Sequence, residues 1–347
     1  MIKPQISFLD RPQCEQIHQA ALEILRRTGV RVFHEEALRL LSEADCMVRE
    51  ENRVHIPPAL VEWALQQPPS RVALCRRGSS EISAALQERT VNFGPGSDCP
   101  NFLDPRTGAH RPFSLADMRA VLQLADSLPE LSFLMSTGIP SDYPSNTYRR
   151  QFATAVQNCL KPIVFVCDDE EDCRRIVAAE AAVAGGEERL RLNPTLLLYS
   201  EPTTPLQHSR TALEKLLVMA EAGIPVVHSP APMMGGTAPI SIAGGLALGA
   251  AEVLSGLVIH QLKRTGSPFV FGSGLHHLDM RTSISVYGAP EFQLARLAVA
   301  DLADSMDCRP GATLDTRTAV CSTSRRPRTP SSLPSSLCRA VPIWYTT

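Results

Sequence analysis

The chain has 347 residues, 44% of them hydrophobic and 20% charged, which is long enough to bury one large core or two modest ones. Its formal net charge is −2, and no dense lysine and arginine stripe interleaves with aromatic residues, so the electrostatic footprint of a nucleic-acid-binding protein is missing. No apolar run approaches the roughly 18 residues of a membrane span, and the start lacks the apolar core of a signal peptide. The ten cysteines show no Cys-x-x-Cys pair, which is typical of reduced thiols. We therefore expect a soluble, cytoplasmic, enzyme-sized protein with no nucleic-acid or membrane partner.

The first third of the chain predicts a small α/β cap. Apolar residues recur at threes and fours over 13–27, which indicates a one-sided helix that Gly29 ends. The elements predicted next are a strand over 30–33, a helix over 35–44, a strand over 53–56 and a helix opened by Pro57 and Pro58. Glycines and the turn at 104–108 then indicate a hairpin with a glycine-rich loop. We assign residues 1–112 to this cap and hairpin.

From residue 113 short apolar runs alternate with helical segments. The predicted strands cover 131–137, 162–167, 195–200, 225–229 and 268–272, and the predicted helices cover 146–160, 171–184, 205–222, 240–264 and 290–306. Strands that are apolar on both faces, each followed by a helix, indicate a parallel sheet. Five such units without a nucleotide-binding glycine fingerprint favour a TIM-type β/α barrel over a doubly wound sheet, although a closed barrel needs eight strands. We therefore predict an α/β fold with an incomplete TIM-type barrel over 113–310.

Residues 311–347 differ in composition from the rest of the chain. They hold five arginines and one aspartate, no lysine or glutamate, and runs rich in serine, threonine and proline. Such a composition does not supply the missing barrel strands and helices. We expect an irregular tail here, either a natural extension or the product of a reading-frame shift near position 310, and the missing barrel units favour the shift.

Several separate stretches carry a resemblance to a known family. They cover 17–32, 54–78, 91–112, 238–262, 266–273 and 279–291. In these stretches the chain resembles the trimethylamine methyltransferase family, which includes members without pyrrolysine that demethylate glycine betaine and related quaternary amines. The resemblance implies a TIM barrel and a role in one-carbon metabolism or methanogenesis. It also implies an oligomer and a cognate corrinoid protein as methyl acceptor, with the cobalamin carried by that partner and no cofactor bound directly by this chain.

The resemblance also implies what the protein itself must do. Because the cobalt of the corrinoid supplies the nucleophile, the protein has to hold the cation, exclude water and point one methyl group outward. A quaternary ammonium already carries a neutral leaving amine, so we expect a quaternary amine as substrate. Aromatic faces and carboxylates bind such a cation. The first candidates lie in the hairpin and after the first barrel strand: Phe93, Asp98, Phe102, Asp104, Asp142 and Tyr143. The structural alternatives are core packing for the rings, turn capping for Asp104, and solvent exposure or amide capping for the other carboxylates.

Further candidates lie at later strand ends. They are Tyr199, Glu201, His228, Met233, Gly235, Gly236, Thr237 and Ser273. Glu201 directly follows a strand, at the carboxyl end where barrel active sites form. His228 has the alternative of a core histidine, and the turn at 235–237 either admits a substrate carboxylate to the next helix N-terminus or serves only close packing. His276, His277 and Asp279 lack a suitably spaced fourth ligand, so no metal site is predicted.

Two alternatives to the methyltransferase remain open at this point. One is a different barrel enzyme, such as a decarboxylase or a Schiff-base aldolase, but Lys161 precedes the second predicted strand and so lies at the wrong end for a Schiff base. The other is a truncated, non-catalytic remnant whose partial barrel exposes apolar strand edges.

Overall fold

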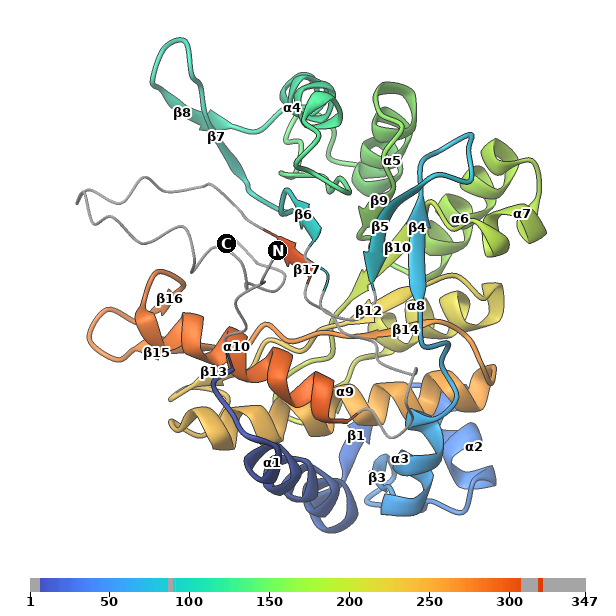
Figure 1. The fold of residues 1–347 in the computed structure, drawn as a ribbon, viewed down its shortest axis with the longest axis vertical. Helices are drawn as coiled ribbons and strands as arrows, with labels where there is room; N and C mark the ends of the chain where they lie inside the picture. The colour runs from blue at the N-terminus through green and yellow to red at the C-terminus, as the bar shows by residue number, and fades with distance from the viewer. Residues whose placement is uncertain (1–6, 87–89, 91, 307–317, 321–347) are drawn as a thin grey trace, which may run out of the picture. The chain divides into compact units, whose positions relative to one another are not determined.

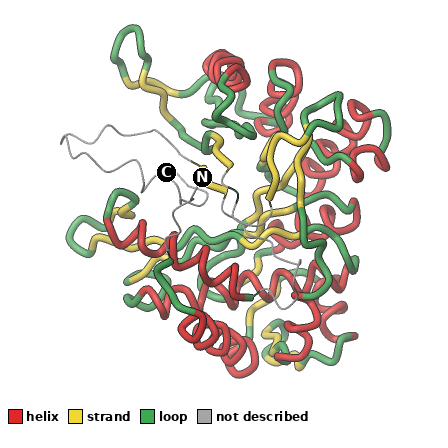
Figure 2. Tube along the Cα trace, viewed as in Figure 1, coloured by secondary structure: helices red, strands yellow, loops and turns green. Residues whose placement is uncertain are grey.

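The computed structural model describes residues 7–86, 90, 92–306 and 318–320. It is a mixed α/β fold (Figures 1 and 2). The chain forms two compact units. Unit 1 comprises Met1–Val72, Gln87–Arg89 and Tyr199–Arg317, and unit 2 comprises Ala73–Leu86, Thr90–Leu198 and Thr318–Thr347. This division follows spatial contacts, and the boundaries drawn from the sequence at 112 and 310 stay predictions.

The N-terminal part of unit 1 contains the helices and strands that the sequence predicts, together with one short strand over 47–49 that was not predicted. They are α1 (Arg11–Glu23), the π-helical turn η1 (Ile24–Thr28), β1 (Val30–Val32), α2 (Glu35–Glu43), β2 (Met47–Arg49), β3 (Arg53–His55) and α3 (Pro58–Leu65). Asp10 and Gln13 form a reciprocal capping box that starts α1. Gly29, with a φ of 71°, ends η1, because this left-handed backbone suits glycine. The predicted cap helices and strands are confirmed.

The second part of unit 1 begins after β10 (Leu196–Ser200). Its elements are β11 (Gln207–His208), α8 (Arg210–Ala222), β12 (Val226–His228), β13 (Met233–Met234), α9 (Ile242–Lys263), β14 (Phe269–Phe271), β15 (His276–Asp279), β16 (Ile284–Val286) and α10 (Pro290–Ser305). Strand β12 pairs in parallel with β14, and the Ser229 amide donates to the Ser200 carbonyl at the end of β10. Parallel strands joined by helices are the β/α alternation that the sequence predicts.

Helix α9 forms the centre of unit 1. It packs against α1, α2, α3, α8 and α10. Of the helices searched among the described residues, α9 alone has the length and apolar character of a membrane span, yet 83% of its apolar window is buried. A helix that is apolar all round and covered on most sides is typical of the core of a soluble protein.

Unit 2 continues the parallel series. Its elements are β4 (Val72–Cys75), β5 (Ile82–Leu86), β6 (Asn92–Gly94), β7 (Asn101–Leu103), β8 (His110–Pro112), α4 (Leu115–Ser127), α5 (Thr147–Asn158), β9 (Ile163–Phe165), α6 (Glu170–Ala184), α7 (Glu187–Leu192) and β17 (Thr318–Val320), together with the start of β10. Parallel bridges join Phe93 to Leu131 and Leu134 to Ile163, and β9 pairs in parallel with β10. Neighbours in the chain are therefore neighbours in the sheet, as in a β/α barrel.

Two sequence predictions differ from the structure, and one long helix was not predicted. The predicted strand over 131–137 forms only isolated bridges. The helix predicted from residue 205 begins instead at Arg210, where Ser209 caps it, because residues 207–208 pair with β1 as β11. Helix α4 was not predicted, although Ser114 and Asp117 form a capping box at its start. The predicted tail lies outside the described residues except for β17, which pairs in parallel with β6.

Candidate functional site

The side chains of Tyr199, Glu201 and Ser229 meet at the carboxyl ends of β10 and β12 in unit 1. Side chains alternate along a strand, so Tyr199 and Glu201 face one side and Ser200 faces the other. The Tyr199 hydroxyl donates to Glu201 Oε1 over 3.1 Å and shares a hydrogen bond with the Ser229 side chain. Burial, helped by the Glu201 carboxylate, raises the pKa of Tyr199 well above its usual value. Tyr199 therefore remains a phenol that donates to the half-buried Glu201 carboxylate.

Gly272, directly after β14, allows the backbone at this corner to pack closely against Ser229 and Val227. A Cβ at Gly272 would lie 2.6 Å from Ser229 Cβ and 2.8 Å from Val227 Cγ2, which real side chains do not tolerate. Ser229 and Val227 therefore face β14 from the same side of β12. His228, between them in sequence, faces the opposite side.

A buried arginine lies next to this corner. Arg296, on α10, is 0% exposed, and its guanidinium donates to the carbonyls of Ser273 and Leu275 in the loop after β14. The guanidinium also lies 4.6 Å from the centre of the Phe292 ring. Burial lowers the pKa of Arg296 to about 10, so it is a cation at neutral pH, and its charge acts on Tyr199 against that of Glu201. Among the described residues no carboxylate forms an ion pair with it.

Aromatic rings gather on the same part of unit 1. Tyr287 stacks on His276 with ring centres 5.3 Å apart and meets Phe292 edge-on at 5.4 Å. His276 Nδ1 is hydrogen-bonded to the Gly274 carbonyl, and burial lowers the pKa of His276. This corner of unit 1 thus combines a carboxylate, a phenol, a buried cation and aromatic faces.

His228 takes the structural alternative, a core histidine. Its ring is 0% exposed, stacks on His208 at 5.6 Å and lies 3.3 Å from Ser200 Oγ through Nδ1. Burial lowers the pKa of His228 well below its usual value. Gly256 of α9 makes room for the ring, because a Cβ there would lie 2.5 Å from His228 Cδ2.

Gly256→Ala is therefore expected to destabilise the protein by about 1 to 3 kcal/mol through overpacking against the His228 ring. Urea unfolding measures this change. Gly288→Ala is the control, because a Cβ at Gly288 meets nothing within 4 Å. Equal stability of the two variants would contradict the tight packing of His228 against α9.

The turn at 235–237 folds back on itself. The amides of Gly236 and Thr237 donate to the Met233 carbonyl, and the Met233 amide donates to Thr237 Oγ1 over 3.0 Å. Gly235 has a φ of 83°, which explains glycine at this position. Ser241 caps the α9 N-terminus by accepting from Gly244. These groups satisfy one another, as in the close-packing alternative.

The first group of candidates lies in unit 2, where most have structural partners. Phe102 packs edge-on against Phe113 and carries the Arg111 guanidinium 5.0 Å above its ring, and Arg150 lies 4.6 Å from the Tyr143 ring. The Asp142 carboxylate accepts from the Leu115 amide at the start of α4, and Asp104 accepts from the Arg106 and Thr107 amides of its turn. Phe93 lies in β6, half-buried. Asp104 and Asp142 therefore act as amide caps.

Asp98 differs from these. It has a φ of 60° in the glycine-rich loop, which runs beside residues 137–138 through the parallel bridge from Cys99 to Gly138. Burial first, and then the carboxylates of Asp98 and Asp168, raise the pKa of Tyr148 at the start of α5. Asp98 is thus close enough to Tyr148 for its carboxylate to act on that hydroxyl, as the Asp168 carboxylate after β9 also does.

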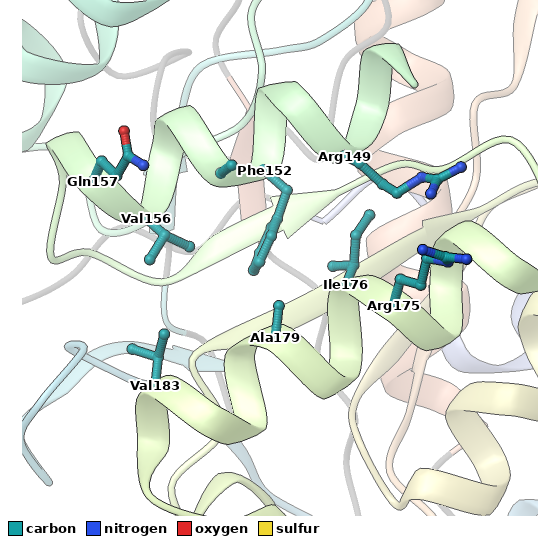
Figure 3. Close-up of a pocket in the computed structure, with 9 residues that line it drawn as sticks. Arg149, Phe152, Val156, Gln157, Arg175, Ile176, Ala179 and Val183 are labelled. Carbon is teal, nitrogen blue, oxygen red and sulfur yellow. The ribbon is translucent and has the colours of Figure 1, made fainter. Parts of the chain in front are cut away.

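A cavity of about 310 Å³ lies between α5 and α6 (Figure 3). Phe152, Val156, Ile176, Ala179 and Val183 line it, and Arg149 and Arg175 lie at one end. Arg149 pairs with Asp172 and Arg175 with Glu171. None of the predicted site residues lines this cavity, so its apolar walls do not belong to the candidate site.

The described residues contain no group of three or more His, Cys, Asp or Glu side chains that could hold a metal ion. His277 lies near Glu291, and the Asp279 carboxylate accepts from the Arg281 amide. Lys161 is 4% exposed and donates to the Ala125 and Leu128 carbonyls at the end of α4. The lysine therefore lies before β9, as predicted, and serves helix capping.

Sequence reasoning missed Ser229 and Arg296. Ser229 directly follows the β12 run and differs little from any serine that ends a strand. Arg296 had a detectable signal, since it lies four residues after Phe292 and three before Val299, on the apolar face of α10. A charge in the buried phase of a helix indicates a polar partner in the core.

Comparison with known proteins shows that the chain matches the sequence model of a known family. The sequence model of the family described as trimethylamine methyltransferase (MTTB) matches residues 2–318. The chain is 31% identical to the trimethylamine methyltransferase MttB of Desulfitobacterium hafniense over 291 residues, covering 83% of this chain and 58% of that protein. It is 29% identical to the glycine betaine methyltransferase of Desulfitobacterium hafniense strain Y51, covering 86% and 62%, and 30% identical to MttB of Methanosarcina thermophila, covering 86% and 63%. The chain thus spans about three fifths of the length of these curated relatives.

Solved structures give a matching fold. The crystal structure of the hydroxylamine MtmB complex has a TM-score of 0.51, and that of the Methanosarcina barkeri monomethylamine methyltransferase (MtmB) has a TM-score of 0.50. Each is 13% identical to this chain, and each match covers 86% of this chain and 60% of the solved one. At this identity the likeness shows the fold alone.

Proposed function

This chain belongs to the trimethylamine methyltransferase family, and on that premise we propose that it transfers a methyl group from a quaternary amine to a corrinoid carried by a separate protein. The observation that carries the proposal is the site at the carboxyl ends of β10 and β12, where Glu201 offers a carboxylate beside Tyr199. In β/α barrels this end of the strands forms the active site. The two matched methyltransferases of Desulfitobacterium hafniense are named for trimethylamine and for glycine betaine.

We further propose that the β/α alternation belongs to a TIM-type barrel. Parallel strands that follow one another in sheet order, each joined to the next by a helix, support this arrangement. The polar side chains of the site stand where the strands end, whereas Lys161 and Thr195 stand where β9 and β10 begin. In a β/α barrel, residues at the carboxyl ends of the strands form the active site, and residues at the amino ends contribute to stability.

The residues fit a methylated ammonium ion. Glu201 supplies the negative charge, and its hydrogen bond from Tyr199 fixes where that charge stands. The half-buried Tyr287 is an aromatic residue of the type that binds quaternary ammonium groups, whereas the Phe292 ring is buried and already carries the Arg296 guanidinium. The partner protein's corrinoid would supply the nucleophile that accepts the methyl group, and the nitrogen would keep the pair of the broken C–N bond and leave as a neutral tertiary amine. The chain itself holds the cation and excludes water.

The proposal places the protein in the cytoplasm with a corrinoid protein as partner. The mostly buried α9 fits this location. A Schiff-base enzyme is the weaker candidate, because the ammonium group of Lys161 is engaged by two carbonyls at the amino end of β9.

Glu201→Gln tests the role of the carboxylate. Removing the charge is expected to weaken binding of tetramethylammonium about tenfold or more, which corresponds to about 1.4 kcal/mol, and to lower methyl transfer from glycine betaine to the cognate corrinoid protein. Calorimetry measures binding, and corrinoid absorbance measures transfer. Glu43→Gln, which removes an exposed partner of Arg39 on α2, is the matched control. Undiminished binding in Glu201→Gln would exclude Glu201 from the site, and a wild-type chain that transfers no methyl group would overturn the function.

A further inference from the structure

Glu252 places a carboxyl group in the middle of an apolar helix, which is an unusual position for an ionisable side chain. Glu252 lies on α9, is 0% exposed and has no cationic partner among the described residues. Its carboxylate accepts from the Leu206 amide over 2.7 Å and from Thr204 Oγ1 over 3.0 Å. A buried carboxylate without a counter-ion costs free energy unless hydrogen bonds compensate it. Both compensating donors come from a single segment of the chain.

That segment leads away from the candidate site. It runs over 203–208, between Glu201 with Pro202 on one side and the start of α8 on the other. Thr203 and Gln207 exchange two backbone hydrogen bonds across it, and the Leu206 carbonyl accepts from Arg31 of β1. Leu206 has a φ of 53°, a conformation that a leucine adopts only where its surroundings hold it. The Glu252 carboxylate is the group that receives the Leu206 amide in this conformation.

The ionisable side chains around Glu252 supply no positive charge that would pair with its carboxylate. Burial raises the pKa of Glu252 to about 7, while the hydrogen bonds from Leu206 and Thr204 oppose that rise. Burial lowers the pKa of His208 to about 4 and that of His260 to about 3, and His228 is likewise kept neutral. His208 is bound through Nε2 to Ser255, one turn along α9 from Glu252. Helix α9 therefore holds the segment at two points, and the nearby histidines carry no charge at neutral pH.

We propose that Glu252 is a positioning residue, which holds the segment 203–208 through the Leu206 amide and the Thr204 hydroxyl and thereby fixes the Glu201 carboxylate in the ammonium site. This inference rests on the proposed function and extends it. The hydrogen bonds, not the charge, carry the effect. A glutamine has an oxygen that accepts from Leu206 and an amide that donates to Thr204 Oγ1, so it keeps both contacts, whereas an alanine keeps neither.

The test uses the full chain and tetramethylammonium as the probe. Glu252→Ala is expected to weaken binding about tenfold and to speed hydrogen exchange at the Leu206 amide, while Glu252→Gln keeps both within about threefold of the wild type. Thr204→Val, which removes one of the two contacts, is expected to fall between them. Val258→Ala is the control, because it removes buried apolar volume from the same helix and its side chain cannot form a hydrogen bond to the segment.

The outcomes separate the proposals. Equal weakening by Glu252→Gln and Glu252→Ala would overturn the hydrogen-bonding role, and equal weakening by Val258→Ala would reduce the effect to loss of stability. Faster exchange at Leu206 with unchanged binding would overturn the link to Glu201. A wild-type chain that fails to bind tetramethylammonium would instead overturn the proposed function, and exchange at Leu206 would still show whether Glu252 holds the segment.

Discussion

Glu180→Ala is expected to lower the free energy of unfolding by about 3 to 5 kcal/mol, because it leaves a buried guanidinium without its counter-ion. In unit 2, Glu180 of α6 is 0% exposed and meets Arg77 Nε at 2.7 Å. The Thr195 hydroxyl also donates to Glu180, and Arg77 Nη1 donates to the Cys159 carbonyl over 2.9 Å. One carboxylate thus joins α6 to the segments before β10 and after β4.

Denaturant unfolding of the full chain measures this loss, which is a large part of the roughly 5 to 15 kcal/mol that stabilises a typical domain. The double variant Arg77→Met with Glu180→Leu is the sharper comparison, because replacing both charges by apolar side chains often restores stability. We expect the double variant to be more stable than Glu180→Ala. If the double variant lost as much stability as Arg77→Met and Glu180→Leu lose in sum when made singly, a direct pairing of the two side chains would be contradicted.

Ligand binding should be unchanged in the folded fraction of Glu180→Ala. Thr195 precedes β10, so the pair is anchored at the amino end of that strand, whereas the candidate site begins where the same strand ends. Tetramethylammonium affinity, measured well below the unfolding transition, distinguishes this from an effect on the site. A tenfold weaker affinity would contradict the separation of the two ends.

Local sequence patterns predicted elements better than they predicted contacts. The repeat of apolar residues in α1, α5, α6 and α9 marks helices whatever their neighbours, because a buried helical face recurs every three to four residues. The segment 205–209 was predicted as the start of a helix, but pairing with β1 competes and α8 starts only at Arg210. That pairing joins residues far apart in the sequence, and no local pattern contains it.

The candidate site shows the same limit. The position of Glu201 was predictable, because it directly follows a buried parallel strand, at the end of the strand where β/α barrels form their active sites. Whether His228 faces the site or the helix layer depends on the phase of β12, and the phase follows from the neighbours of Ser229 and Gly256. Glu252 and Gln261 of α9 bind different partners, Leu206 for one and Ser267 for the other, and no local pattern predicts either contact.

Arg296→Met is expected to destabilise unit 1 by about 2 to 5 kcal/mol, because it leaves the Ser273 and Leu275 carbonyls without their charged donor. Methionine is close to arginine in length and keeps contact with Phe292, so lost packing contributes little. Urea unfolding measures the change. Arg296→Lys is the control, since one ammonium group supplies the charge but not the planar pair of donors. Its stability should lie between those of the wild type and Arg296→Met.

The same variant has a second effect on ligand binding. The charge of Arg296 acts on Tyr199 against the charge of Glu201, so its removal leaves the site more negative. If the loop after β14 keeps its place, Arg296→Met should bind tetramethylammonium more tightly than the wild type, because a nearby positive charge is gone. Weaker binding together with faster hydrogen exchange at Leu275 and His276 would mean that the loop itself shapes the site, and Arg296 would then act by holding that loop. The sign of the change in affinity therefore separates the electrostatic role of Arg296 from its structural one.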